Sequence, residues 1–195
     1  MKTTYHLKQF LITEKNFTVN NADEFIKNYK DLVRGFFETY PRFSDDQRKT
    51  LLSFLNDMED PGMCLHGDCH PGNFIMSKGT VYAIDLSFFS RGNPLMDVGC
   101  FYCFATKMPD DVIRGVFHVE PEVMEKFWDI FLPTYLETND PKVLSDFEEK
   151  IEAYGIVGIA QHASHLEDPY VFFDILDRDY EKAFAWYKKE LANRK

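Results

Sequence analysis

The feature that most constrains this chain is a short segment with the pattern of a β-hairpin. Two apolar runs, residues 74–76 (FIM) and 81–84 (VYAI), flank a glycine-containing connection, residues 77–80 (SKGT). This pattern predicts two antiparallel strands joined by a tight connection. The residue before the first strand and the residue after the second should then lie roughly 5 Å apart at the open end of the hairpin. We therefore expect Asn73 and Asp85 to meet there, although twelve positions separate them in the sequence.

The side chains at this end of the hairpin offer oxygen ligands to a divalent cation. The amide oxygen of Asn73 beside the carboxylate of Asp85 suits a hard cation such as Mg²⁺. Asp68, upstream on the same loop, is then available as a base. In phosphoryl transfer, one Asp accepts the proton of the attacking hydroxyl while an Asn and a second Asp hold the metal. The spacing of these three residues therefore points to phosphoryl-transfer chemistry.

The same segment resembles the aminoglycoside phosphotransferase and choline kinase group of protein-kinase-like enzymes. Residues 65–73 (LHGDCHPGN) are similar to the catalytic loop of this group. Residues 84–85 (ID) are similar to its metal-binding Asp, and residues 92–99 (GNPLMDVG) to the segment that follows. The resemblance implies a small-molecule kinase that transfers the γ-phosphoryl group of ATP to a hydroxyl of an aminoglycoside, an amino alcohol or a sugar.

The resemblance also implies a role for each residue of the motif. Asp68 would be the catalytic base, and Asn73 and Asp85 would bind Mg²⁺ and, through it, the co-substrate ATP. His66 is grouped with Asp68 in the catalytic loop, where we expect it to form structural hydrogen bonds and not to transfer a proton. Asp97 would be a structural support that braces this loop.

Three further histidines are candidates for contact with the substrate. His70 lies inside the loop, and His162 and His165 recur at near-helical spacing with Glu167 and Asp168. These side chains would line a substrate cleft or, as the alternative, form a solvated helix face or a satisfied packing site.

Outside the hairpin the chain has the periodicity and the capping residues of amphipathic helices. Ser44 followed three positions later by Gln47 has the pattern of a capping box. The predicted helices cover residues 22–39, 45–58, 95–105, 109–117, 121 onward, 141–163 and 168–191, with a brief strand at 63–65. We expect Pro133 to kink or split the fifth helix, and the sixth to break near Gly155 or Gly158, which would also allow close helix contact. The predicted fold class is α+β, mostly α.

The expected organisation is a single domain, residues 1–195, in which residues 1–20 form a leading strand, an extended arm or a linker. Kinases of this group have a β-rich N-terminal lobe with a Gly-rich loop and a Lys–Glu pair for the nucleotide. Before His66 this chain has only Gly35 and Gly62. We therefore expect a kinase-like C-terminal lobe whose N-terminal lobe is absent: an excised lobe, a natural half completed by a partner chain, or an inactive relic.

Composition narrows the partners and the location. The formal net charge of −10 argues against nucleic acid, which needs a basic surface. It is compatible with a cationic small-molecule substrate, and equally with solubility alone. The chain shows neither an apolar run that would span a bilayer nor the apolar core of a signal peptide at its N-terminus, so we expect a cytoplasmic protein without membrane contact.

Of the four cysteines, Cys100 and Cys103 form a Cys-x-x-Cys pair. We expect the cysteines to be buried reduced thiols, with a metal site as the alternative.

Two other functions stay open at this point. The first is that of a catalytically silent kinase-like module that binds a ligand or a partner. Alternatively, the cluster of His66, Asp68 and His70 would hold a metal in a metal-dependent hydrolase.

Overall fold

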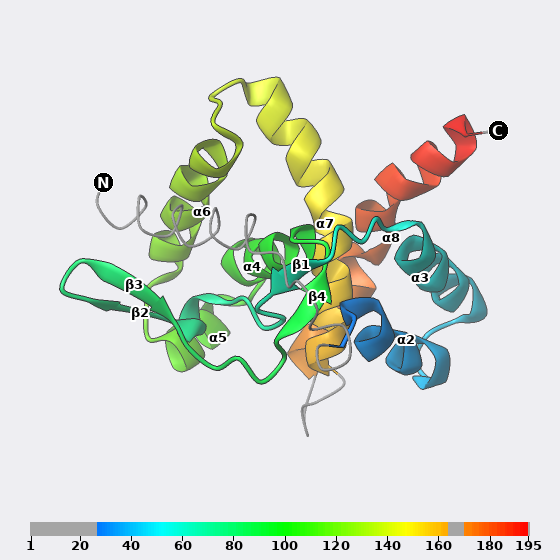
Figure 1. Cartoon of the computed structure of the whole chain (residues 1–195), viewed down its shortest axis with the longest axis horizontal. Helices are drawn as coiled ribbons and strands as arrows, with labels where there is room; N and C mark the ends of the chain where they lie inside the picture. The colour runs from blue at the N-terminus through cyan, green and yellow to red at the C-terminus, as the bar shows by residue number, and fades with distance from the viewer. Residues whose placement is uncertain (1–26, 164–169, 195) are drawn as a thin grey trace.

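The computed structural model describes residues 27–163 and 170–194 (Figure 1). The predictions for residues 1–20 and for His165 lie outside the described residues. The described part is mostly helical, with two small antiparallel sheets. None of its helices is long and apolar enough to cross a membrane.

The predicted hairpin is confirmed, with a tighter turn than expected. Strands β2 (Phe74–Ser77) and β3 (Thr80–Ala83) pair antiparallel along their whole length. Only Lys78 and Gly79 connect them, and both have positive φ angles, 51° and 81°. This is the geometry of a two-residue type I′ turn, whose twist matches that of the strands. In Figure 1 the hairpin projects from one side of the molecule, away from α3 and α8.

A second sheet positions the chain that enters the loop after residue 65. The predicted strand at 63–65 is confirmed as β1 (Met63–Leu65), and it pairs antiparallel with β4 (Ser90–Gly92). Arg91 of β4 also donates its backbone N–H to the carbonyl of Lys27 at 3.0 Å. Nothing in the local sequence indicated β4, because its pairing partners lie far away along the chain.

The helices follow one another in the predicted order, with short helical turns between some of them. They are α2 (Tyr29–Thr39), α3 (Asp45–Asp57), the 3-10 turn η1 (Pro71–Asn73), α4 (Leu95–Thr106), α5 (Asp110–Val112), the π-helical turn η2 (Ile113–Phe117), α6 (Pro121–Leu136), α7 (Pro141–Ala163) and α8 (Tyr170–Asn193). The capping box of α3 is confirmed, since Ser44 and Gln47 exchange both hydrogen bonds. The predicted continuous helix over residues 22–39 is wrong at residues 27 and 28, which are not helical; residues 22–26 lie outside the described residues. Asn28 has extended backbone angles and caps α2, because the chain just before it is bonded to β4.

Two predicted breaks in helices are absent. Pro133 lies inside α6 (Pro121–Leu136) without splitting it, and a kink at this position stays a prediction. Helix α7 runs without a break through Gly155 and Gly158. These glycines instead allow close helix contact, as predicted: a Cβ on Gly155 would lie 2.6 Å from the carbonyl oxygen of Gly99 in α4.

Helix α4 is the centre of the core, and its residues from Met96 to Ala105 are all buried. It packs on α7, which packs in turn on α8. In Figure 1, α4 lies at the middle of the molecule between the hairpin side and the α7–α8 side. The four cysteines are buried reduced thiols, as predicted. This packing places the first turn of α4 and the last part of α7 beneath the loop of residues 66–73.

Candidate active site

The loop of residues 66–73 rests on a buried carboxylate in the first turn of α4. Asp97 is 2% exposed. Its Oδ2 accepts a hydrogen bond from the backbone N–H of His66 at 2.7 Å, and its Oδ1 accepts one from that of Gly67 at 2.9 Å. Burial raises the pKa of Asp97 to about 6, against the opposing effect of these two hydrogen bonds. These are the contacts that a bracing role requires.

His66 joins the loop to the hairpin. Its Nε2 donates to the carbonyl of Ile84 at 2.9 Å. Its Nδ1 is then the unprotonated nitrogen and accepts from the backbone N–H of Asp68 at 3.3 Å. The ring is buried, and both of its nitrogens are bonded to backbone groups of the protein. These two bonds tie His66 to the backbone at Ile84 and at Asp68.

Gly67 is needed where the loop passes under the segment that follows the hairpin. Its φ of 79° lies in the left-handed region that favours glycine. A Cβ at this position would lie 2.1 Å from the carbonyl oxygen of Phe88. A larger residue would therefore push the loop away from residue 88 and displace Asp68.

The carboxylate of Asp68 is held by three side chains. Its Oδ1 lies 2.5 Å from Nε2 of His162 and 3.5 Å from Nε2 of His70. Its Oδ2 accepts from Nδ2 of Asn73 at 3.0 Å, and the same amide nitrogen donates to the backbone carbonyl of Asp68 at 2.8 Å. Burial acts to raise the pKa of Asp68, but the hydrogen bonds and charges of His162 and His70 outweigh it and hold the pKa well below its usual range.

His162 reaches Asp68 from α7, across 94 positions of sequence. Its other ring nitrogen, Nδ1, donates to the carbonyl of Gly158 at 2.8 Å. The carbonyl of Gly158 and the carboxylate of Asp68 both accept hydrogen bonds, so the ring of His162 lies between two acceptors. The sequence singled out His162 as a substrate contact but gave no signal for this pairing. His70, the other predicted substrate contact, packs its ring against Phe104 at 5.0 Å between centroids.

Asn73 and Asp85 lie at the open end of the hairpin. The backbone N–H of Ile84 donates to the carbonyl of Asn73 at 2.9 Å, so Asp85 follows directly after the residue paired with Asn73. Nδ2 of Asn73 is committed to Asp68, which leaves Oδ1 as the oxygen that can face a cation. Asp85 is exposed with a φ of 57°, and its Oδ1 accepts from the backbone and the hydroxyl of Ser87 at 3.3 and 2.5 Å.

The oxygens of Asn73 and Asp85 suit a Mg²⁺ ion whose other ligands are substrate phosphates and water. Mg²⁺ takes oxygen ligands, often one or two carboxylates together with waters and substrate phosphates. Among the described residues no cluster of three or more His, Cys, Asp or Glu side chains could hold a metal ion. The ring nitrogens of His66 are also bonded to backbone groups, so His66, Asp68 and His70 do not form the ligand set that a metal-dependent hydrolase would need.

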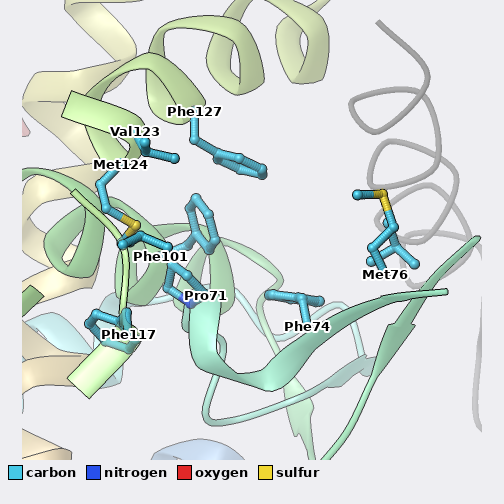
Figure 2. Close-up of a pocket in the computed structure, with 10 residues that line it drawn as sticks. Pro71, Phe74, Met76, Phe101, Phe117, Val123, Met124 and Phe127 are labelled. Carbon is cyan, nitrogen blue, oxygen red and sulfur yellow. The ribbon is translucent and has the colours of Figure 1, made fainter. Parts of the chain in front are cut away.

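Two cavities adjoin the loop of residues 66–73. One, of about 460 Å³, has Asp68, His70, Gln161 and His162 at its polar end. The other, of about 340 Å³, is lined by apolar side chains of β2, α4 and α6. Figure 2 shows Phe74, Phe101 and Phe127 pointing into this second cavity from these three elements. Of these two cavities, as lined by the described residues, the first combines space for a small molecule with the carboxylate of Asp68.

The comparisons with known proteins agree with the motif. A model of the phosphotransferase enzyme family matches residues 21–125, which is more than half of the chain. Neither a curated protein nor a solved structure matches the chain. The family match covers the loop, the hairpin and the first turn of α4, and on this basis the chain belongs to the phosphotransferase enzyme family.

Proposed function

We propose that the chain transfers the γ-phosphoryl group of ATP to a hydroxyl of a small molecule that binds in the cavity beside Asp68. The observation that carries this proposal is the carboxylate of Asp68, which lies at the polar end of a cavity of about 460 Å³ and is oriented from both of its oxygens. An oriented carboxylate next to a ligand cavity is what a general base requires.

In this proposal the residues of the site have separate tasks. Asp68 accepts the hydrogen bond of the acceptor hydroxyl and takes its proton as the new O–P bond forms and the bond from the γ-phosphorus to the ADP leaving group breaks. Asn73 orients Asp68 through Nδ2 and offers Oδ1, together with a carboxylate oxygen of Asp85, to Mg²⁺. When bound, Mg²⁺ neutralises charge on the phosphates. His66 and Asp97 hold the backbone of the loop.

We further propose that residues 1–195 form one kinase-like C-terminal lobe, with the groups that grip the nucleotide supplied from outside the described residues. The support is the outer face of the hairpin, where Ile75, Tyr82 and Ile84 are 49%, 53% and 39% exposed. Exposed apolar side chains grouped in this way are typical of a surface that another element covers. In kinases the nucleotide-binding lobe lies above the catalytic loop.

The proposal is tested by incubating the full chain with γ-labelled Mg·ATP and a panel of alcohols, and by measuring label in the alcohol. Transfer that is lost in Asp68→Asn, and retained in Asp129→Asn on the exposed side of α6, supports it. Transfer that persists in Asp68→Asn at the wild-type rate contradicts the role of Asp68. Each variant is compared with the wild type by thermal unfolding, so that loss of the fold is recognised.

A catalytically silent binding module is the second candidate. The observation that favours it is the strong pairing of Asp68, whose Oδ1 and Oδ2 are both occupied by side chains of the protein. Calorimetry of Mg·ATP binding to the full chain separates the two candidates. Nucleotide binding that requires Mg²⁺ and is weakened by Asp85→Asn supports the kinase, and binding that is indifferent to both supports the silent module.

A further inference from the structure

The cavity beside Asp68 has one small polar end and a large apolar wall. Besides the four polar residues at Asp68, the described lining consists of eight apolar side chains from α4, the α5–η2 segment, the start of α8 and the segment after the hairpin. Phe104, Phe117 and Phe172 form a connected group of rings in this wall, with centroid distances of 5.8 Å and 6.0 Å from Phe104 to the other two. A ligand in this cavity therefore exchanges water for hydrocarbon over most of its surface.

Among the described residues, the polar end offers no unengaged carboxylate for a positive charge. Asp68 is the only carboxylate among the described residues that line the cavity, and it is engaged by His162, His70 and Asn73. The ring of His162 already bridges Oδ1 of Asp68 and the carbonyl of Gly158, at 2.5 Å and 2.8 Å. An ammonium group brought into the cavity would lose its hydration without gaining an unengaged carboxylate.

We infer that the acceptor of this site is an uncharged alcohol with an apolar body, whose hydroxyl reaches Asp68 while its body packs against the phenylalanine wall. This inference rests on the proposed function, because it takes Asp68 as the group that receives the hydroxyl. It differs from the cationic acceptor that the net charge of −10 had suggested. The net charge is a sum over the whole chain, whereas the acceptor is selected by the residues that line the cavity.

Two probe molecules of the same shape test the inference. In 4-phenylbutan-1-ol and 2-(benzylamino)ethanol the chains are of equal length and differ by one CH₂ replaced by a protonated NH₂⁺. Binding of each probe to the full chain at pH 7 is measured by ligand-observed NMR titration. We expect the neutral alcohol to bind at least about tenfold more tightly, because the charged probe must be dehydrated. Equal or tighter binding of the amine, or no binding of either probe, overturns the inference.

A matched pair of variants locates the binding. Val116 lines this cavity and Val123 lines the other one, and both are exposed, at 62% and 52%. We expect Val116→Glu to reduce or reverse the preference for the neutral probe, because it adds an unengaged carboxylate to the wall, and Val123→Glu to leave the preference unchanged. An unchanged preference in Val116→Glu, or the same change in Val123→Glu, overturns the assignment to this cavity.

The two proposals fail in different ways. Probe binding needs neither nucleotide nor metal, and phosphoryl transfer needs both. If the neutral probe binds with the expected preference but receives no phosphoryl group from Mg·ATP, the proposed function is wrong and the ligand class stands. If phosphoryl transfer occurs with the amine in preference to the alcohol, the ligand class is wrong and the proposed function stands.

Discussion

The two aspartates assigned to the chemistry lie in opposite surroundings, although both belong to the segment around the hairpin. The side chain of Asp68 is 14% exposed, and partners from the loop itself and from α7 hold both of its oxygens. Asp85 is exposed, has a positive φ, and is bonded through one oxygen to Ser87, two positions along the chain. One carboxylate is thus held by distant elements of the fold, and the other by its own turn.

This difference corresponds to the tasks that we propose. A base must be oriented before the hydroxyl arrives, and such orientation requires side chains locked by packing and by further hydrogen bonds. A ligand that shares a cation with phosphates receives part of its orientation from the complex, so that a local turn is sufficient. Substitutions at the two aspartates should therefore differ in what they change.

The largest effect is expected for Asp68→Asn. An amide cannot accept the proton of the acceptor hydroxyl, and the loss of a general base lowers kcat by about 10³-fold. The variant also loses its ion pair with His162, so we expect a small decrease in melting temperature. The measurement is single-turnover phosphoryl transfer, with Asp129→Asn as the control for an exposed aspartate. A decrease of less than about tenfold would mean that another group takes the proton.

Asp85→Asn should change activity with little change in stability. The amide is a poorer ligand for Mg²⁺ than the carboxylate, so we expect transfer to fall by about 10²-fold and to recover in part as Mg²⁺ is raised. Asn tolerates the positive φ of this position, and the residue is exposed, so the melting temperature should stay within about 1 °C of wild type. A large loss of stability would show that Asp85 is a structural residue, as well contacted as Asp68.

Asp97→Asn tests the support beneath Asp68. The variant places an NH₂ group against the backbone N–H of His66 or of Gly67, and one buried donor loses its acceptor. We expect the free energy of unfolding to fall by about 2 kcal/mol. Urea unfolding, followed with the exposed Asp129→Asn as control, measures this effect. Wild-type stability in the variant would contradict the bracing role of the carboxylate.

Asp97→Asn should also change how the free energy of unfolding depends on pH. Burial raises the pKa of Asp97 from 3.8 to about 6, so between these values the folded state holds a proton that the unfolded state has released. The free energy of unfolding of the wild type should receive a contribution from Asp97 that is present below about pH 4 and is lost as pH rises through 6. Asp97→Asn lacks this contribution, and its unfolding should depend less steeply on pH in that window. Identical slopes would contradict the raised pKa.

The hairpin before Asp85 and, elsewhere in the fold, helix α3 could be predicted from the sequence because their signals are local. The hairpin follows from two apolar runs and a Lys78-Gly79 connection, and α3 from Ser44 and Gln47. Where the prediction failed, the cause was a distant contact. In the described part of the chain α2 starts at Tyr29, because Lys27 and Asn28 pair with β4, which has no local signal of its own.

The surroundings of Asp68 could be predicted only in part, for the same reason. The motif gave Asp68 and Asn73 their roles by resemblance, and glycines in α7 correctly indicated close helix contact. The partner His162 was singled out for its spacing with other polar residues of α7, a pattern that does not reveal what it faces. Its contact with Asp68 depends on how α7 packs against α4, and Gly99 and Gly155 set that distance.

His162→Gln tests this long-range contact. Glutamine keeps a hydrogen-bond donor but removes the positive charge that lowers the pKa of Asp68. The pKa should therefore rise, and the acid limb of the pH–rate profile should move to higher pH. We expect a decrease of about tenfold in kcat/KM from less accurate orientation of the carboxylate. The same substitution at the exposed His118 is the control. An acid limb that stays in place would show that His162 does not act through Asp68.

The smallest effect is expected at the tip of the hairpin, where Lys78→Asn should stabilise the protein slightly. Lys78 has a φ of 51° beside Gly79 at 81°, and Asn-Gly is the preferred pair for a type I′ turn. We expect a gain of about 0.3 kcal/mol in the free energy of unfolding, whereas Lys78→Val, a β-branched residue at positive φ, should destabilise. Because α4 and α7 hold Asp68 independently of the hairpin tip, kcat should be the same in both variants. A change in kcat would mean that Asp68 and Asp85 are coupled through the hairpin. The orientation of Asp68 would then depend on the hairpin as well as on α4 and α7.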